Sequence, residues 1–467
     1  MSKKVVIVGG GVAGLSAGIY SAMNGFETEI IEMHTVAGGQ CTAWDRKGYR
    51  FDYCLHWLVG TSQGAFNEIW KETNVINDDT EIIDHEIHSR ILDDQGNEFI
   101  IYSNIDQWEK YLIELAPEDK SSIKKMCTDM RKSALMEPFE TAPELRNPLD
   151  NIKMLPKMLP LLNVIRKYGR MTCGEYFEKL NFKSDKIKNI FFTMYGDSDF
   201  SALFFIFMLG WYHQKNAGYI KGGSYPMAHR MVEKFEKLGG KMSYKKKVEK
   251  IIVENNVAKG VFLSILGDIL KGYKNWKLFT PIVQVSFGIN KSIPCETSNV
   301  SHICNDKWIG KTKLDKGYSI MNYWFDTTMA PEGKTSIALR FESPWELWEM
   351  MDEAAYQAEK LQITKDATAL LEKEYPGILE FIEVTDVATP KTDVKYTGVK
   401  DGAYEGFFPS KENLMKSLKM QLPKLRNFYM AGQWLYPGGG LPPSAQSGKW
   451  VIQLICKKEK QKFVADK

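Results

Sequence analysis

The glycine-rich segment near the start of the chain constrains the fold more than any other feature. The apolar run at residues 5–8 leads directly into three glycines, and helix-forming residues follow at 12–24. A continuously apolar run of this length is typical of a parallel strand that is covered on both faces. A strand, a glycine turn and a helix in this order predict the opening of a doubly wound α/β domain.

The glycines match the GxGxxG pattern of a dinucleotide-binding turn. In that pattern Gly9 allows the tight turn, Gly11 lets the backbone approach a pyrophosphate, and Gly14 allows the helix to pack closely on the strand. The unpaired N–H groups of the first helical turn, at Val12 and Ala13, and the positive end of the helix dipole then stabilise the phosphates. No lysine is needed at such a site.

An acidic residue completes the pattern. Residues 28–32 have the composition of a second strand, and Glu32 at its end lies 32 minus 14, or eighteen, residues after Gly14. A carboxylate at this place accepts hydrogen bonds from the adenosine ribose and repels a 2′-phosphate. The complete order therefore predicts a dinucleotide site. A glycine-rich turn with a surface glutamate is the alternative.

A second glycine-rich segment favours FAD over a nicotinamide cofactor. Residues 38–41 read Gly-Gly-Gln-Cys shortly after the acid, and residues 431–442 carry two further glycine clusters just before an expected helix at 444–456. FAD is long enough to need contacts from both ends of a chain, whereas a nicotinamide cofactor is normally held within one doubly wound unit. We therefore predict FAD as the cofactor.

Charge and cysteine content narrow the class of protein. The chain has 61 Lys and Arg residues against 58 Asp and Glu, which is too balanced for a protein that mainly binds nucleic acid. The seven cysteines include no CxxC pair, so we expect a reducing compartment, no disulfide framework and no metal site. The chain begins without a signal peptide, and the longest apolar run, 200–212, is too short to span a bilayer. These features predict a cytoplasmic protein, with peripheral contact to the inner face of the membrane as an open possibility.

Changes in the sequence pattern divide the chain into five segments. A polar Glu-Asn-Asn turn at 254–256 between two apolar runs predicts a hairpin, residues 345–375 predict a long helix, and residues 428–431 predict a short strand. We expect a Rossmann-type FAD-binding domain interrupted by an inserted α+β substrate domain. The FAD-binding domain comprises 1–88, 219–265 and 389–467, and the substrate domain comprises the mainly helical 89–218 and the second part 266–388.

Several motifs occur in a fixed order along nearly the whole chain. They lie at 5–32, 38–44, 48–52, 54–58, 219–226, 389–406 and 432–448. In this order they resemble the flavin-dependent family of phytoene desaturases, carotenoid isomerases and retinol saturases, within the wider amine oxidase group. The two ends carry the motifs that are specific for FAD, and the matches in the middle are weaker.

The resemblance implies contacts with FAD for particular residues. Gly39 and Gln40 would lie along the ribityl and pyrophosphate, and Val248 would present its backbone to the adenine. Gly432 and Gln433 would meet the pyrophosphate or the ribityl. The full expected set is Gly9, Gly11, Val12, Ala13, Gly14, Glu32, Gly39, Gln40, Trp57, Val248, Gly432, Gln433, Gly440 and Leu441.

The start of the last helix has a physical reason to face the flavin. The resemblance implies that Gly440 and Leu441 approach the flavin ring, so that the helix following Pro443 points its dipole at the pyrimidine edge. A positive helix end stabilises negative charge on the reduced ring.

Two departures from the family pattern stand out. Gln433 occupies a position where the group often has an acid, so a charge-assisted contact becomes a neutral one, which FAD binding should survive. The run 257–263 is followed directly by Ser264-Ile265 rather than by a polar turn and another strand. Either the chain is naturally shorter here, in which case the cofactor sheet loses a strand and the domain boundaries shift, or a flexible loop and a strand are absent from this sequence.

The inserted segments are where a substrate would be recognised. The aromatic residues could wall an apolar tunnel for a polyene or isoprenoid, or they could form an ordinary core. Apolar residues of 154–162, with basic neighbours, could form a membrane-touching lip, or they could belong to an amphipathic packing helix. The aromatic candidates are Phe191, Phe192, Phe204, Phe205, Phe207, Trp211 and Tyr212; the lip candidates are Met154, Leu155, Met158, Leu159, Leu161 and Leu162.

The resulting hypothesis is an FAD-dependent oxidoreductase that moves hydride between flavin N5 and carbon atoms of a long apolar substrate, desaturating or saturating a C–C bond. His56 is the histidine best placed near the flavin, and a packed imidazole without a role is equally compatible with the sequence. A reduced-flavin polyene isomerase, a flavin amine oxidase and a non-catalytic prenyl-binding protein of the GDP-dissociation-inhibitor type are alternatives. The electron partner could be a quinone, oxygen or another protein.

Overall fold

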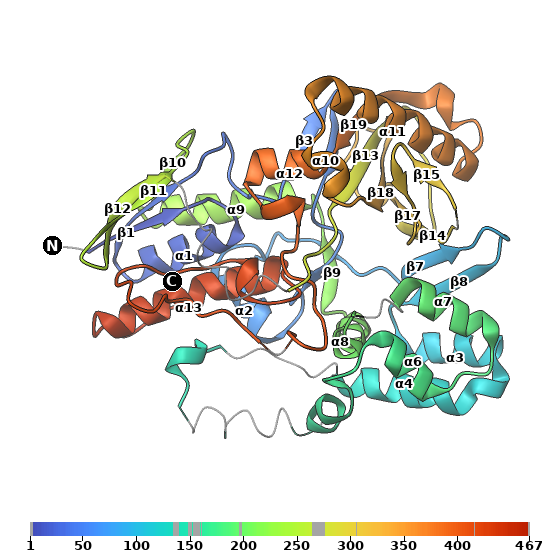
Figure 1. The fold of residues 1–467 in the computed structure, drawn as a ribbon, viewed down its shortest axis with the longest axis horizontal. Helices are drawn as coiled ribbons and strands as arrows, with labels where there is room; N and C mark the ends of the chain where they lie inside the picture. Colours follow the sequence, from blue (N-terminus) through green and yellow to red (C-terminus); the bar gives the residue numbers. More distant parts are fainter. Residues whose placement is uncertain are drawn as a thin grey trace.

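The computed structural model shows an α/β unit that contains both ends of the chain, a large sheet and a group of helices (Figure 1). It describes residues 3–133, 140–147, 152, 159, 161–195, 199–263, 276–304, 306–414 and 416–465. The question of a missing strand after Leu263 falls on residues 264–275, outside the described part of the chain.

The predicted strand–glycine–helix opening is confirmed. A parallel sheet has the order β1-β2-β10, and the helix α1 follows the glycine turn after β1. The bounds are β1 Lys4–Val8, α1 Val12–Met23, β2 Glu27–Ile31 and β10 Lys241–Ser243. This is the Rossmann-type unit expected from the sequence.

The expectation that the first strand is covered on both faces is wrong. Val6 and Val8 are 38% and 52% exposed, because alternate residues of a strand point to the same face and this face of β1 is only partly covered. Residues 428–431 were expected to form a strand, but they adopt no regular structure, and Met430 N donates to Met420 O instead. Within the described residues, no strand therefore pairs with the outer edge of β1.

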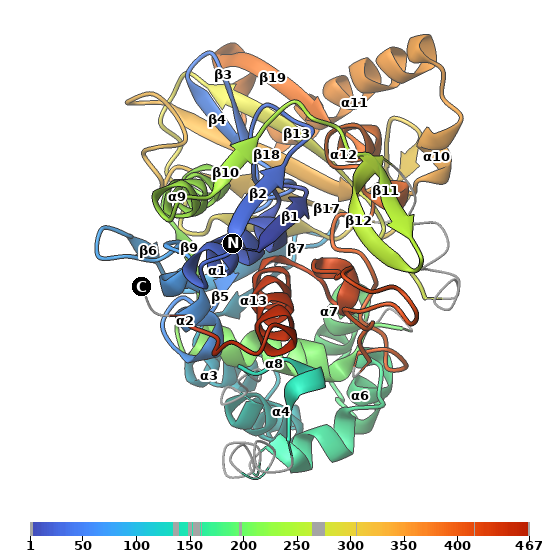
Figure 2. The same ribbon diagram turned by 90° about the vertical axis from the view of Figure 1, so that its left-hand side faces the viewer.

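The C-terminal helix returns to the N-terminal unit. Helix α13 (Leu441–Lys458) packs along α1, and the two helices lie side by side in both ribbon views (Figure 2). The approach is close because a Cβ on Gly448 would lie 2.6 Å from Ala13 O. Ser16 Oγ also donates to Ala445 O at 2.6 Å. The starts of α1 and α13 are thereby fixed relative to each other.

Several short elements connect this unit to the rest of the molecule. The predicted hairpin is confirmed as β11 and β12, and its turn residues Asn255 and Asn256 have φ values of 49° and 59°. Such positive φ values are typical of a tight two-residue hairpin turn. The bounds are β3 Ala43–Arg46, β4 Tyr49–Asp52, β5 Leu58–Val59, α2 Gly64–Glu72, β6 Ile82–Ile83, β9 Ala217–Ile220, α9 Ser224–Lys237, β11 Glu249–Glu254 and β12 Val257–Leu263.

A seven-stranded sheet dominates the inserted part of the described chain, with the order β19-β13-β18-β17-β14-β7-β8. Its pairs are antiparallel except for β14 with β7. The strands are β7 Ile87–Leu92, β8 Glu98–Tyr102, β13 Ile282–Ile289, β14 Asn299–His302, β17 Tyr318–Asn322, β18 Thr335–Glu342 and β19 Ile382–Ala388, with a small hairpin of β15 Trp308–Ile309 and β16 Thr312–Lys313.

Helices cover this sheet and form a separate group beside it (Figure 1). The predicted helix at 345–375 is present but interrupted, because Asp352 caps a second helix by accepting from Ala355 N. These helices are α10 Glu346–Glu349, α11 Glu353–Glu374 and α12 Pro390–Thr397; the helical group comprises α3 Ile105–Leu115, α4 Lys120–Ser133, α6 Cys173–Leu180, α7 Asp185–Tyr195 and α8 Ala202–His213.

Within the described residues, we find no helix with the length and apolar character needed to cross a membrane. Much of the expected membrane-touching lip, including Met154, Leu155 and Met158, lies outside the described residues. Leu159 and Leu162 are 58% and 42% exposed, whereas Leu161 is buried.

Candidate functional site

The glycine turn after β1 has the conformation that the motif requires. Gly9 has φ of +95°, and its N–H donates to Ile31 O at 2.9 Å. A Cβ on Gly14 would lie 1.9 Å from Gly9 O, so only glycine allows α1 to start this close to the turn. Val12 and Ala13 form the first turn of α1, which has no side-chain cap at Gly11.

Glu32 is buried at the end of β2, beside the same turn. Its Oε2 accepts from Gly10 N at 2.6 Å, and its Oε1 accepts from His34 N at 2.8 Å. Lys246 N donates to Glu32 O at 2.9 Å, which brings the chain leading to the half-buried Val248 close to this acid. The predicted adenosine-side residues are therefore brought together.

Two glutamines join the N-terminal and C-terminal halves of the predicted site. Gln433 Nε2 donates to Gln40 Oε1 and to Tyr404 O, both at 2.8 Å. Gln40 Nε2 is buried and makes no hydrogen bond of ordinary geometry. Gly39 lies against the glycine turn, since its Cβ would be 3.2 Å from Gly11 Cα. The hydrogen bond brings together residues that lie 393 positions apart in the chain.

The start of α13 is the second glycine-rich helix end. Gly440 is its N-cap with φ of +86°, no side chain caps the helix, and Leu441 is its first residue. A Cβ on Gly439 would lie 2.0 Å from Glu405 O, and one on Gly440 would lie 4.0 Å from Glu405 Oε1. The Glu405 carboxylate therefore lies beside the place where the resemblance puts the flavin ring.

These residues fit an extended dinucleotide. A Cβ on Gly9 or on Gly432 would meet nothing within 4 Å, so open space adjoins both glycines. The Gln40 amide is a buried donor without a hydrogen bond of ordinary geometry, and the Gln40 side chain also acts on the Asp393 carboxyl, whose pKa it lowers. The uncapped start of α1 supplies N–H groups and a positive dipole end for phosphates. The start of α13 supplies the Leu441 N–H and a positive dipole end, because Pro442 and Pro443 have no N–H.

The segment after β4 is held rigidly next to this site. Asp52 is buried and accepts from Cys54 N, Leu55 N and both the N–H and the Oγ of Ser224, at 2.5 to 2.9 Å. The buried Arg340 donates to Gln284 Oε1 and to the carbonyls of Asp52 and Tyr53. These bonds fix the path of the chain towards His56.

His56 is exposed and the neighbouring Trp57 is half-buried. The residues packed around the His56 ring lower its pKa to about 3 through desolvation, and the Arg340 cation contributes. His88 is half-buried and burial lowers its pKa to about 4. Tyr212 joins these residues, since its ring lies 5.3 Å from Trp57 and 4.3 Å from His88. Both imidazoles are therefore neutral near pH 7.

Glu405 is a functional candidate that the sequence reasoning missed. Its side chain is half-buried, and burial raises the pKa of its carboxyl to about 7. A carboxyl group that titrates near neutrality beside a cofactor can hold or release a proton. The sequence placed Glu405 only within a matching motif, because the burial depends on distant residues.

Some of the aromatic candidates lie in the core of the helical group, and others are half-buried. Phe191, Phe205 and Phe207 are buried in the core of the helical group, where Phe191 stacks on Phe177 at 5.1 Å. The ordinary-core interpretation therefore holds for these three. A second stripe of α8 is half-buried at helical spacing and comprises Phe204, Met208, Trp211 and Tyr212. Phe204 lies against Gly438 and Tyr212 against Trp57, whereas Met208 and Trp211 pack on the core of the helical group.

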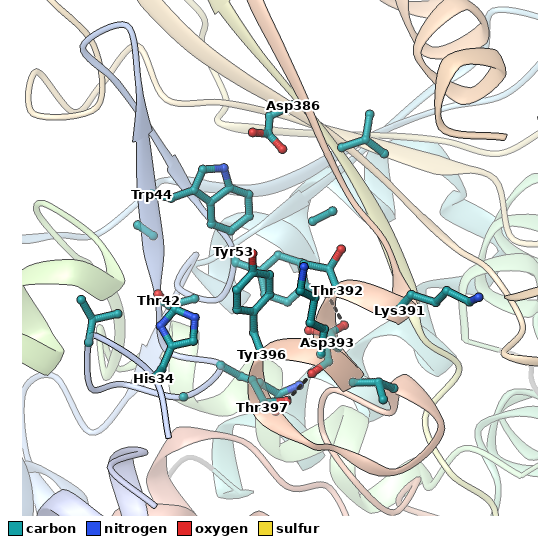
Figure 3. Close-up of a pocket in the computed structure, with 18 of the residues that line it drawn as sticks. His34, Thr42, Trp44, Tyr53, Asp386, Lys391, Thr392, Asp393, Tyr396 and Thr397 are labelled. Carbon is teal, nitrogen blue, oxygen red and sulfur yellow. Dashed lines mark hydrogen bonds between the residues drawn. The ribbon is translucent and has the colours of Figure 1, made fainter. Parts of the chain in front are cut away.

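A pocket of about 750 Å³ opens between the segment 34–46 and α12 (Figure 3). Glu32, Gly39 and Gln40 line it, so the pocket reaches the predicted cofactor path. Figure 3 shows Tyr53 directed at Asp393, and the Tyr53 hydroxyl donates to Asp393 Oδ2 at 2.6 Å. Burial raises the pKa of Asp393 to about 7, although this hydrogen bond opposes the shift.

The Asp393 carboxyl predicts a specific pH dependence of stability. Because its pKa is higher in the folded protein than in the unfolded chain, its contribution is greatest below about pH 4 and is lost as the pH rises to about 7. Relative to Asp393→Asn, the free energy of unfolding should fall by roughly 2–3 kcal/mol between pH 5 and pH 8. Urea denaturation of both proteins at the two pH values measures this difference. An equal change in the free energy of unfolding in the two proteins would contradict a raised pKa of Asp393.

Comparisons with known proteins agree with this geometry. Residues 7–73 match the NAD(P)-binding Rossmann-like domain family. Prolycopene isomerase 2, chloroplastic, from an Oncidium hybrid cultivar is 21% identical over 95% of this chain and 82% of its own length. The 4,4'-diapophytoene desaturase (4,4'-diapolycopene-forming) of a Methylomonas species is 23% identical over 99% and 97%. The predicted resemblance is confirmed.

The fold class is confirmed as well. An oxidoreductase from Methanosarcina mazei has a solved structure with a TM-score of 0.57 to this chain, at 14% identity, covering 96% of this chain and 100% of the other. The chain therefore resembles the carotenoid desaturase and isomerase group along nearly its whole length and has the Rossmann-type α/β fold with an inserted α+β part.

Proposed function

We propose that the protein is an FAD-dependent oxidoreductase that desaturates or saturates C–C bonds of a long apolar substrate of the carotenoid, isoprenoid or retinoid type. The observation that carries the proposal is the pair of uncapped glycine-rich helix starts at Gly11 and Gly440, whose adjoining segments are joined by the hydrogen bond from Gln433 to Gln40. The relatives named for diapophytoene desaturation and prolycopene isomerisation support the substrate class.

Residues of this chain would hold FAD from end to end. Glu32 would accept hydrogen bonds from the adenosine ribose, and the first turn of α1 would face the pyrophosphate. Gln40 and Gln433 would bind the ribityl or the pyrophosphate oxygens, and Gly440 and Leu441 would adjoin the ring. When bound, FAD supplies the acceptor or donor for hydride.

The substrate would lie against the half-buried stripe of α8. Phe204, Met208, Trp211 and Tyr212 are half-buried and apolar or aromatic, and the Tyr212 ring contacts Trp57, the neighbour of His56. Such walls bind a polyene by burial of apolar area and exclude water from the reacting carbons. His56 stays neutral near pH 7, so it would orient groups rather than supply charge.

Glu405 would handle the proton that accompanies hydride transfer. Desaturation removes a hydride and a proton from neighbouring carbons, and saturation adds them back. A carboxyl group with a pKa of about 7 is half-protonated at neutral pH, so it can accept the proton in one direction and donate it in the other.

A polyene isomerase using the reduced cofactor is the second candidate. It is favoured by the resemblance to prolycopene isomerase 2 and by the same titrating carboxyl group at Glu405, since proton addition and removal at a polyene can exchange bond geometry without net oxidation.

We also propose a cytoplasmic location, where the exposed Leu159 and Leu162 are available for contact with a membrane.

The visible absorption spectrum of natively purified protein tests the proposal. We expect a flavin spectrum, release of FAD on denaturation, and bleaching or reoxidation of the bound flavin by a polyene. Colourless protein that takes up no FAD would overturn the proposal and favour a non-catalytic binding protein. Bound FAD that no polyene, isoprenoid or retinoid bleaches or reoxidises would keep the flavoprotein class and overturn the substrate class.

A further inference from the structure

Two cysteines face each other at the open end of the hairpin β3–β4. The strands pair Ala43 with Asp52, and Tyr53 N donates to Thr42 O at 3.1 Å, which extends the ladder by one pair. The next opposite positions are Cys41 and Cys54. Opposite residues of an antiparallel ladder lie on one face with Cα atoms about 4.5–5.5 Å apart, and a disulfide requires about 4.4–6.8 Å. If the ladder continues by one more pair, the two residues lie at a spacing that a disulfide can bridge.

The two thiols also interact. Contact with the Cys41 side chain, followed by burial, raises the pKa of Cys54 well above its usual value. Cys41 is 1% exposed, and its Sγ lies 3.8 Å from Ser224 O and from Met227 Sδ. Cys54 is half-buried. Cys54 is thus the more accessible of the two thiols.

The pair lies between the predicted cofactor contacts. Cys41 directly follows Gly39 and Gln40, and the carboxylate of Glu405, which adjoins Gly440, acts electrostatically on Cys54. The raised pKa of Cys54 keeps its thiol uncharged near pH 7. A disulfide is uncharged as well, so its formation places no new charge in this region.

We propose that Cys41 and Cys54 form a redox-active dithiol that exchanges two electrons with the bound flavin. In one direction two S–H bonds break and an S–S bond forms, and two electrons and two protons pass to the oxidised flavin. In the other direction the reduced flavin returns them and the S–S bond breaks. The pair gives the protein a second two-electron store beside the cofactor. The exchange rests on the proposed function, because the flavin is its partner.

Electron counting and disulfide mapping test the pair together. Flavin-loaded protein is oxidised with diamide, freed of reagent and titrated anaerobically with dithionite. We expect four electrons per flavin for the wild type and two for Cys54→Ser or Cys41→Ser. Peptide mapping of the oxidised wild type should give one cross-linked pair, because Arg46, Lys47 and Arg50 separate the two cysteines after trypsin digestion.

Cys304→Ser is the matched control, since Cys304 is a buried cysteine of the sheet domain. It should still take four electrons. Two electrons per flavin and free thiols in the oxidised wild type would overturn the proposal. The same peptide mapping of flavin-free protein in glutathione buffers separates the dithiol from the proposed function. If the protein takes up no FAD but forms a Cys41–Cys54 disulfide in these buffers, the proposed function and the exchange with flavin are overturned, while the dithiol is established. If no Cys41–Cys54 disulfide forms in these buffers, the dithiol itself is overturned.

Discussion

Replacing Gly14 by alanine is expected to weaken FAD binding at least about hundredfold, which is about 2.7 kcal/mol. The new Cβ would lie 1.9 Å from Gly9 O and 3.1 Å from Gly9 C, both main-chain atoms of the turn that would face the pyrophosphate. Main-chain atoms have no alternative rotamer, so either α1 or the turn must move. The dissociation constant of FAD from the flavin-free variant, followed by flavin fluorescence, measures the effect.

Gly18→Ala is the control on the same helix. Its Cβ would lie 2.6 Å from Ile30 Cδ1, the movable end of a side chain, and 3.1 Å from the ring of Phe235. We expect a loss of stability of about 1–3 kcal/mol from overpacking and FAD affinity within about threefold of the wild type. Equal FAD affinities for the two variants would show that the turn of Gly9 to Gly14 does not hold the cofactor.

The parts of the fold that the sequence predicted depend on local geometry. The turn at Gly9 requires positive φ, and the hairpin at Asn255 and Asn256 requires it at two successive residues. Glycine and asparagine adopt this conformation readily, so the residue types report the backbone directly. The same locality made the dinucleotide motif recognisable from residues 9–32 alone.

The errors came from longer-range pairing. The apolar run at 5–8 predicted a strand covered on both faces, but the face that carries Val6 and Val8 is partly exposed. A run of apolar residues carries no information about which distant segments pack on each face. The membership of the large sheet likewise depends on the pairing of β14 with β7, which brings together residues more than 200 positions apart.

The sequence contains a signal that distinguishes the two faces of α8, but we treated its aromatic residues as one group. The aromatic residues of α8 have two faces, and helical spacing distinguishes Phe204, Met208 and Tyr212 from the buried Phe205 and Leu209. Because nearly every residue of this helix is apolar, no polar face marks which side lies in the core. The packing of the neighbouring helices decides which face of α8 lies in the core, and the sequence alone does not show that packing.

Replacing Glu405 by glutamine is expected to lower the rate of flavin reduction or reoxidation by the substrate by about 10²–10⁴-fold, the usual range for loss of a general acid or base. Glutamine keeps the shape of the side chain but exchanges no proton near pH 7. In the wild type, burial raises the pKa of Glu405 to about 7, so a desaturation that needs the carboxylate should accelerate as the pH rises through 7. A saturation that needs the protonated acid should slow over the same range, and the variant should show neither change.

Two control measurements show whether the effect of Glu405→Gln comes from the loss of proton transfer. FAD affinity should stay within about threefold of the wild type in Glu405→Gln, because the carboxyl group lies beside the ring position and makes no expected contact with phosphate. Glu412→Gln, which alters an exposed glutamate seven residues further along the same segment, should leave the rate and the pH profile unchanged. An unchanged rate and pH profile in Glu405→Gln would assign the proton to another group. His56 and His88 would not provide the inflection near pH 7, because burial holds their pKa values at about 3 and about 4.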